Sequence, residues 1–110
     1  MKRIVILMVS GCLLLTSFSE KRLPVIHVVN MEGMRFSPDR LEIKAGESVR
    51  WINRSSSAHN VIANDKRFKS KMLPDEGDQF EYKFERAGVV HYYCQPHRMM
   101  GMRGVIVVNK

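Results

Sequence analysis

From residue 20 onward, hydrophobic and polar residues alternate over short segments that are separated by turn-forming residues. Alternation with a period of two is typical of strands with one face toward a core and the other toward solvent. The segments that fit this pattern are residues 25–29, 41–43, 48–53, 61–62, 80–84, 89–93 and 105–108. No window shows a sustained helical period. The pattern therefore predicts an all-β fold, a sandwich of two sheets.

Turn signals rich in Gly, Pro, Asp and Ser stand between these segments, at residues 37–39, 44–47, 74–78 and 86–88. Residues 64–73 are polar and irregular, and we expect a surface connection there, with room for one turn of helix. Trp51 is predicted to lie in the core, and Met31 and Met34 are expected to be packing residues.

The first 19 residues differ in character from the rest. Lys2 and Arg3 precede an apolar run that ends in small residues, a pattern that favours a signal peptide over residues 1–19 and one small domain over residues 20–110. Two alternatives remain: an uncleaved membrane anchor, or a lipoprotein leader whose Cys12 becomes the lipidated N-terminus. We expect a protein that is periplasmic or otherwise exported, and that contacts a membrane only through such an anchor.

Net charge and cysteine content limit the classes of partner and of site that the sequence allows. The formal charge of +7 loses two positive residues with the leader and leaves +5, which weakly favours acidic partners. A nucleic-acid partner is not expected, because the basic residues are scattered and no nucleic-acid motif is present. Cys94 would be the single cysteine after removal of the leader, so no intramolecular disulfide can form, and metal coordination is one reason for an exported protein to keep a lone thiol.

The segment from Cys94 to Met102 reads Cys-Gln-Pro-His-Arg-Met-Met-Gly-Met and places a thiol, an imidazole and thioethers on one loop. His59 supplies a second imidazole upstream. A thiolate and two imidazoles with a weak axial thioether form the ligand set of blue-copper electron-transfer sites. Met102 is the axial candidate because it keeps a Gly-Met-x-Gly frame before the last strand.

Strand alternation supports this arrangement. Val90, Tyr92 and Cys94 fall on one face of their strand, so Cys94 is predicted to point inward at the end of the strand. Tyr93 falls on the outward face, where we expect an exposed side chain at a docking surface. Asn60, next to His59, is expected to hydrogen-bond across the site and fix its geometry. His27 and His91 are predicted to be surface or packed residues without metal.

Other metal functions fit the sequence less well. Structural zinc normally takes a fourth Cys, His or carboxylate, which Met102 does not supply. A binuclear copper site needs a second cysteine. A copper enzyme passes electrons to a catalytic centre through histidines beside the cysteine, whereas Tyr93 and Gln95 stand there, so we do not expect an enzyme. A periplasmic copper carrier that uses the same site stays open, because Met99 and Met100 add exposed thioethers, although we assign both mainly to an apolar rim around His97.

Residues 87–97, continuing through 101–109, resemble the C-terminal signature of the plastocyanin, pseudoazurin and amicyanin group of cupredoxins. Phe36-Ser37-Pro38, residues 46–51 and His59-Asn60-Val61 resemble the earlier landmarks of that family in the same order. The resemblance implies a Greek-key β-sandwich with one copper ion bound by His59, Cys94, His97 and Met102. It also implies a monomer that shuttles single electrons between transient redox partner proteins. We expect these partners to dock near His97 and to present acidic surfaces.

Overall fold

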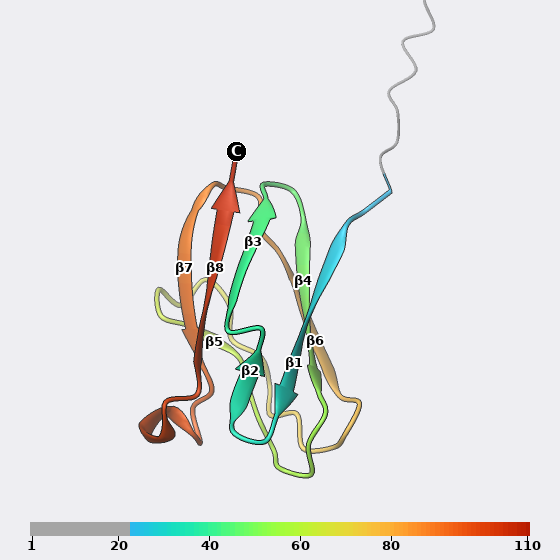
Figure 1. Ribbon diagram of the computed structural model, residues 1–110, viewed down its shortest axis with the longest axis vertical. Coiled ribbons are helices and arrows are strands. Elements are labelled where there is room, and N and C mark those ends of the chain that lie inside the picture. The colour runs from blue at the N-terminus through green and yellow to red at the C-terminus, as the bar shows by residue number, and fades with distance from the viewer. Residues whose placement is uncertain (1–22) are drawn as a thin grey trace, which may run out of the picture.

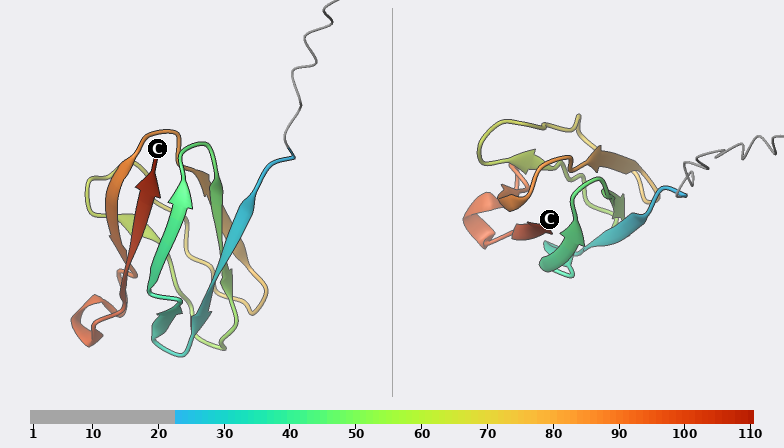
Figure 2. Two further views of the ribbon diagram at one scale, coloured as in Figure 1. Left: turned by 45° about the horizontal axis from the view of Figure 1, so that its top comes forward. Right: turned by 90° about the horizontal axis from the view of Figure 1, so that it is seen from above.

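The computed structural model describes residues 23–110, which form two facing sheets of four strands each (Figures 1 and 2). The predicted leader, residues 1–19, lies outside the described residues. The strands are β1 (Ile26–Glu32), β2 (Arg35–Ser37), β3 (Arg40–Lys44), β4 (Ser48–Asn53), β5 (Ile62–Ala63), β6 (Gln79–Lys83), β7 (Gly88–Tyr93) and β8 (Arg103–Asn109). The expected all-β sandwich is confirmed.

The order of strands is β2-β1-β4-β6 in one sheet and β3-β8-β7-β5 in the other. β1 pairs with β4 and β3 pairs with β8 in parallel, while the other pairs are antiparallel. β7 and β8 lie side by side, with Tyr92 opposite Gly104. Their lower ends in Figure 1 carry the connection from Cys94 to Met102, which protrudes at one end of the sandwich.

The core lies between the sheets and centres on Trp51 of β4, whose side chain is fully buried. Its ring lies 5.2 Å from the ring of Tyr92, 5.5 Å from Phe68 and 5.7 Å from Phe80, measured between centroids. Tyr92 also meets Phe36 edge to face at 4.7 Å. Such aromatic pairs contribute about 0.5–1.5 kcal/mol beyond the burial of their area, so this cluster holds the two sheets together.

The strands and their connections differ from the sequence predictions in several places. A short strand, β2, was not predicted and shares only Ser37 with the predicted turn at residues 37–39, and β1 continues beyond the predicted segment to Glu32. Residues 64–73 contain no helix, and Phe68 within them is only 5% exposed because it packs against Trp51. The connection does run over the surface at most of its residues, but the prediction did not include its anchoring in the core through Phe68. Met34 is 43% exposed instead of packed, because it lies in the tight turn between β1 and β2.

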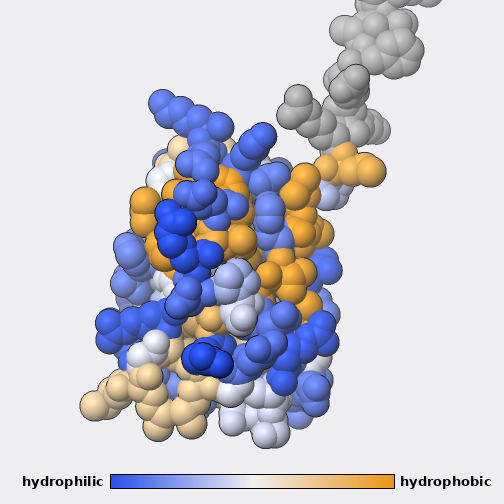
Figure 3. Space-filling model, viewed as in Figure 1, coloured by the Kyte–Doolittle hydropathy of each residue, from blue (hydrophilic) through white to orange (hydrophobic). Residues whose placement is uncertain are grey.

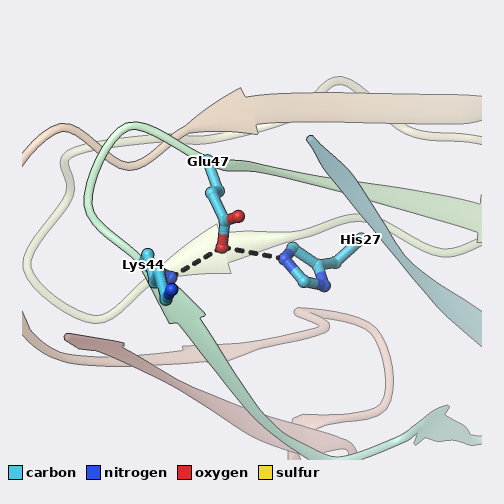
Figure 4. A network of polar contacts seen from close by, with 3 residues as sticks. All are labelled: His27, Lys44 and Glu47. Carbon is cyan, nitrogen blue, oxygen red and sulfur yellow. Dashed lines mark hydrogen bonds and ion pairs between the residues drawn. The ribbon is translucent and has the colours of Figure 1, made fainter. Parts of the chain in front are cut away.

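A polar clamp joins β1 to the turn between β3 and β4 (Figure 4), and Figure 1 shows this turn at the end of the sandwich opposite the Cys94 connection. The Glu47 carboxylate accepts the backbone N–H of Lys44 at 2.7 Å and lies 3.0 Å from Nε2 of His27. The Lys44 N–H and, after it, His27 lower the pKa of Glu47 below its ordinary value of 4.5. His27 on β1 is thus a packed residue with Glu47 as its structural partner, and it does not belong to the cluster of His59, Cys94 and His97.

Figure 3 shows polar surface interrupted by an apolar area over the start of β1, by smaller apolar patches toward the left, and by a moderately apolar area at the lower left. Leu23, Val25, Ile26 and Val28 are the exposed apolar residues over the start of β1. Within residues 23–110, no helix has the length and apolar character needed to cross a membrane.

Candidate metal centre

Three of the predicted ligands meet at the end of the sandwich where β7 ends. The Cys94 Sγ lies 3.6 Å from Nδ1 of His59 and 3.5 Å from Nδ1 of His97. One potential ligand atom from each residue lies within 4.8 Å of the others, although His59 and Cys94 are 35 positions apart in the chain. His59 and Cys94 are fully buried, while His97 is partly exposed. The structure therefore brings together two imidazoles and a thiol with one imidazole at the surface.

Cys94 owes its position to the alternation of β7. Val90 and Tyr92 are 2% and 1% exposed, and Cys94 continues their inward face. Backbone hydrogen bonds from Cys94 N to the Met102 carbonyl (3.1 Å) and from Met102 N to the His97 carbonyl (3.3 Å) close the connection. The Met102 side chain is fully buried. These bonds hold Cys94, His97 and Met102 in one compact loop.

A short 3-10 helix, η1 (Arg98–Met100), fills the middle of this loop and was not predicted from the sequence. Gly101 ends it in a left-handed conformation (φ 81°) that glycine adopts without steric cost. The helix turns Met99 and Met100 outward, so they are 101% and 64% exposed. The two thioethers thus lie on the surface close to His97 in sequence, in agreement with the expected apolar rim.

His59 is held by the body of the sandwich. It pairs with Leu73 through two backbone hydrogen bonds, of 3.2 Å and 2.7 Å. The neighbouring Asn60 accepts the backbone N–H of Gln95 at 2.8 Å, and this confirms the expected contact across the site. Because Gln95 follows Cys94 directly, this bond fixes the His59 segment against the loop.

A contact that the sequence analysis missed lies on the far side of the His59 ring. The Ser55 hydroxyl is 2.9 Å from Nε2 of His59, so the ring nitrogen that faces away from Cys94 also has a partner. The run of three serines at residues 55–57 was the available signal, but nothing in the sequence distinguishes Ser55 from its neighbours.

The electrostatics of the pocket favour neutral imidazole. Burial lowers the pKa of His59, the positive charge of a protonated His97 lowers it further, and the backbone of Gly33 opposes both in part. Imidazole and thiolate are borderline and soft ligands, which copper and zinc prefer and which magnesium and calcium do not. Among residues 23–110, no carboxylate belongs to the cluster. The donor set therefore fits a soft transition-metal ion.

Tyr93 does not lie as the sequence analysis expected. Its ring is 8% exposed, because the Arg98 guanidinium stacks over it at 4.2 Å from the ring centroid. Stacking of a guanidinium on an aromatic face combines a cation–π attraction with shielding from water. What faces solvent beside the loop is thus the positive charge of Arg98 and not a tyrosine.

Comparisons with known proteins agree with this geometry. The family described as copper binding proteins, plastocyanin/azurin family, matches residues 24–109. Plastocyanin of Scenedesmus fuscus is 34% identical over 84 residues, which cover 67% of this chain and 86% of the plastocyanin. Amicyanin of Paracoccus denitrificans is 34% identical over 87 residues, covering 74% of this chain and 64% of the amicyanin. The solved structure of a purple cupredoxin from Nitrosopumilus maritimus superposes with a TM-score of 0.70 at 31% identity, covering 76% of this chain and 99% of that one.

Proposed function

The chain belongs to the plastocyanin/azurin family of copper-binding proteins and is a type 1 copper electron-transfer protein, and we propose that His59, Cys94, His97 and Met102 hold its one ion. The observation that carries the assignment is the meeting of three ligand atoms within 4.8 Å. Bound copper supplies a one-electron couple between its cuprous and cupric states.

Each residue has a role that follows from its position. Cys94 and His59 lie in a dry pocket, where burial and hydrogen bonds tune a redox potential. Met102 is buried and contributes a thioether, a ligand type that stabilises the cuprous state. His97 is the partly exposed ligand, so its ring connects the pocket with the surface at which a partner docks.

The docking surface consists of the residues around His97. Met99 and Met100 give it an apolar centre that suits brief contacts. Within residues 23–110, neither Arg98 nor Arg103 makes a salt bridge, so their charges are available to steer an acidic partner. We infer transient docking of acidic redox proteins on this surface by a monomeric carrier. Arg98→Glu should slow the electron-transfer rate to an anionic redox partner, and the difference from the wild type should shrink at high salt.

An absorption spectrum of the copper-loaded protein tests the function. We expect an intense thiolate-to-copper band in the visible for the wild type and for His27→Ala, whose histidine pairs with Glu47 and is not part of the ligand cluster. Cys94→Ser should abolish the band. A wild-type Cu(II) complex without a strong thiolate band would contradict the assignment.

A copper carrier is the second candidate, and the exposed thioethers of Met99 and Met100 are the observation that favours it. Electrochemistry and exchange with a chelator separate the two functions. Reversible one-electron cycling with slow loss of copper supports the electron carrier, whereas irreversible redox behaviour with rapid loss of copper supports the copper carrier.

We also infer export, with a leader over residues 1–19. Fractionation and mass measurement of the mature protein test this inference. A product that begins near residue 20 supports a cleaved signal peptide, a lipid-modified product that begins at Cys12 supports the lipoprotein alternative, and the full-length mass in the membrane fraction supports an anchor.

A further inference from the structure

The side chain of Asn53, the last residue of β4, is locked in one orientation. It is fully buried, and its Nδ2 donates to the carbonyl oxygens of Ser57 at 2.8 Å and Leu73 at 2.9 Å. An amide nitrogen donates and does not accept, so these two acceptors determine which end of the amide is nitrogen. The Asn53 Oδ1 then faces Ser55 and accepts its backbone N–H at 2.9 Å.

This orientation determines where the Ser55 hydroxyl proton lies. The Ser55 Oγ is 2.9 Å from Asn53 Oδ1, which has lone pairs and no proton to give. A hydroxyl has one proton, and it has two oxygen acceptors here, Oδ1 at 2.9 Å and the Ser57 carbonyl at 3.3 Å. The proton points to the nearer Oδ1, since otherwise the lone pairs of two oxygens would face each other at 2.9 Å. The Ser57 N–H at 3.3 Å donates to Oγ and occupies one of its two lone pairs. Ser55 Oγ therefore has one free lone pair, and it can only accept from His59.

We propose that Asn53 and Ser55 are positioning residues that fix His59 as the Nε2–H tautomer and turn the lone pair of Nδ1 toward Cys94. The Ser55 Oγ lies 2.9 Å from Nε2, and Nδ1 on the other side of the ring lies 3.6 Å from Sγ. A neutral imidazole carries its proton on either nitrogen, and the hydrogen bond at one nitrogen decides which one is free. A proton on Nδ1 would block the ligand atom that the pocket presents.

These contacts form a relay of hydrogen bonds that runs from backbone carbonyls to the ligand His59. Backbone carbonyls orient Asn53, Asn53 orients the Ser55 hydroxyl, and the hydroxyl selects the His59 tautomer. The backbone of Gly33 also lies beside His59 and is a second acceptor for a proton of this ring. The experiment therefore has to distinguish the effect of the Ser55 hydroxyl on the tautomer from the effect of the Gly33 backbone.

The tautomer is a property of the metal-free protein, so the first measurement does not depend on copper. In ¹⁵N-labelled metal-free protein, the ring couplings of His59 should report the Nε2–H tautomer. Ser55→Ala should introduce a detectable fraction of the Nδ1–H tautomer, and Ser55→Thr, which retains a hydroxyl, should restore the wild-type pattern. Ser57→Ala is the matched control, because within residues 23–110 only the backbone of Ser57 takes part in this network.

The second measurement is copper affinity by competition with a chelator. The role of this relay in metal binding rests on the proposed copper function. Loss of an orienting hydrogen bond behind a ligand histidine typically reduces metal affinity about 10- to 100-fold, and we expect a loss in this range for Ser55→Ala and none for Ser57→Ala.

Two results would overturn the proposal. One is the Nδ1–H tautomer in the wild-type metal-free protein, which can be observed whether or not Ser55→Ala folds. The other is a folded Ser55→Ala that keeps both the tautomer and the affinity, which would assign the role to the Gly33 backbone. Failure of the copper function itself has a different signature, because the wild type would then lack the thiolate band while its His59 tautomer stayed fixed.

Discussion

The contact between Gly104 and Tyr92 allows a sharp test of the packing behind the metal loop. A Cβ added to Gly104 would lie 2.2 Å from both Cζ and Oη of Tyr92 and 2.7 Å from Cε1. Carbon atoms in contact stay about 3.5–4.0 Å apart, so the ring would have to move by more than about 1 Å. Tyr92 is 1% exposed and packed against Phe36 and Trp51, so a shift of its ring disturbs both of these contacts.

We expect Gly104→Ala to destabilise the protein by about 3 kcal/mol, the upper end of the usual range for overpacking a core. Gly104 lies within a strand and has no positive φ, so the backbone adds no strain of its own. For a domain of this size, the loss corresponds to a fall of about 12 °C or more in melting temperature. Urea unfolding of the metal-free protein measures the free energy, and calorimetry measures the melting temperature.

A double-mutant cycle identifies the cause. Tyr92→Leu shortens the side chain, so Gly104→Ala should cost much less in the Tyr92→Leu background, with a coupling energy of at least about 1 kcal/mol. Gly77→Ala is a control with open space around the new Cβ but a φ of +92°, and it should lose only about 1 kcal/mol from backbone strain. If Gly104→Ala unfolds within about 0.5 kcal/mol of the wild type, or shows no coupling with Tyr92, the steric reasoning is wrong.

Three further predictions concern other contacts. Because two hydrogen bonds lower the pKa of Glu47, its stabilising contribution is present above pH 4.5 and is lost as the pH falls through the lowered value. The difference in unfolding free energy between wild type and Glu47→Gln, measured in urea at about pH 7 and about pH 3, should therefore shrink in acid, whereas an unchanged difference would exclude the clamp with His27. Asn60→Ala leaves the buried side of the Gln95 N–H without its acceptor and should cost about 2 kcal/mol in urea unfolding, while Asn60→Asp, which keeps an acceptor oxygen, should cost less; equal losses would contradict this role. Phe68→Ala should cost about 3–5 kcal/mol by the same assay, and a loss below about 1 kcal/mol would show that Phe68 is peripheral to the core.

The sequence was sufficient to predict the sandwich and the three residues that meet at the site. Cys94 and His97 are three positions apart at the end of an alternating strand, so their proximity follows from local geometry. Phe68 could not be predicted as a core residue, because it lies in a segment without periodicity and its burial depends on Trp51 from another strand.

Tyr93 and Ser55 illustrate a second limit. Alternation correctly turns Tyr93 away from the core, but the stacking of Arg98 over its ring depends on the shape of η1, which no periodic pattern predicts. Ser55 is one of three neighbouring serines, and only the fixed Asn53 amide distinguishes it. Side-chain contacts within irregular segments need the folded backbone before they can be identified.

The parallel pairing of β3 with β8 has a consequence for the folding kinetics. It places Arg40 opposite Val105, so the sheet that carries the loop is complete only after two distant parts of the chain have met. Folds dominated by such non-local pairs have a high contact order and fold in milliseconds to seconds. The segment from Cys94 to Met102 is local, whereas His59 precedes β5 and is brought to the loop by the pairing of β5 with β7, in which Ile62 lies opposite Tyr93. Completion of the three-residue cluster thus requires a second non-local pairing, between β5 and β7.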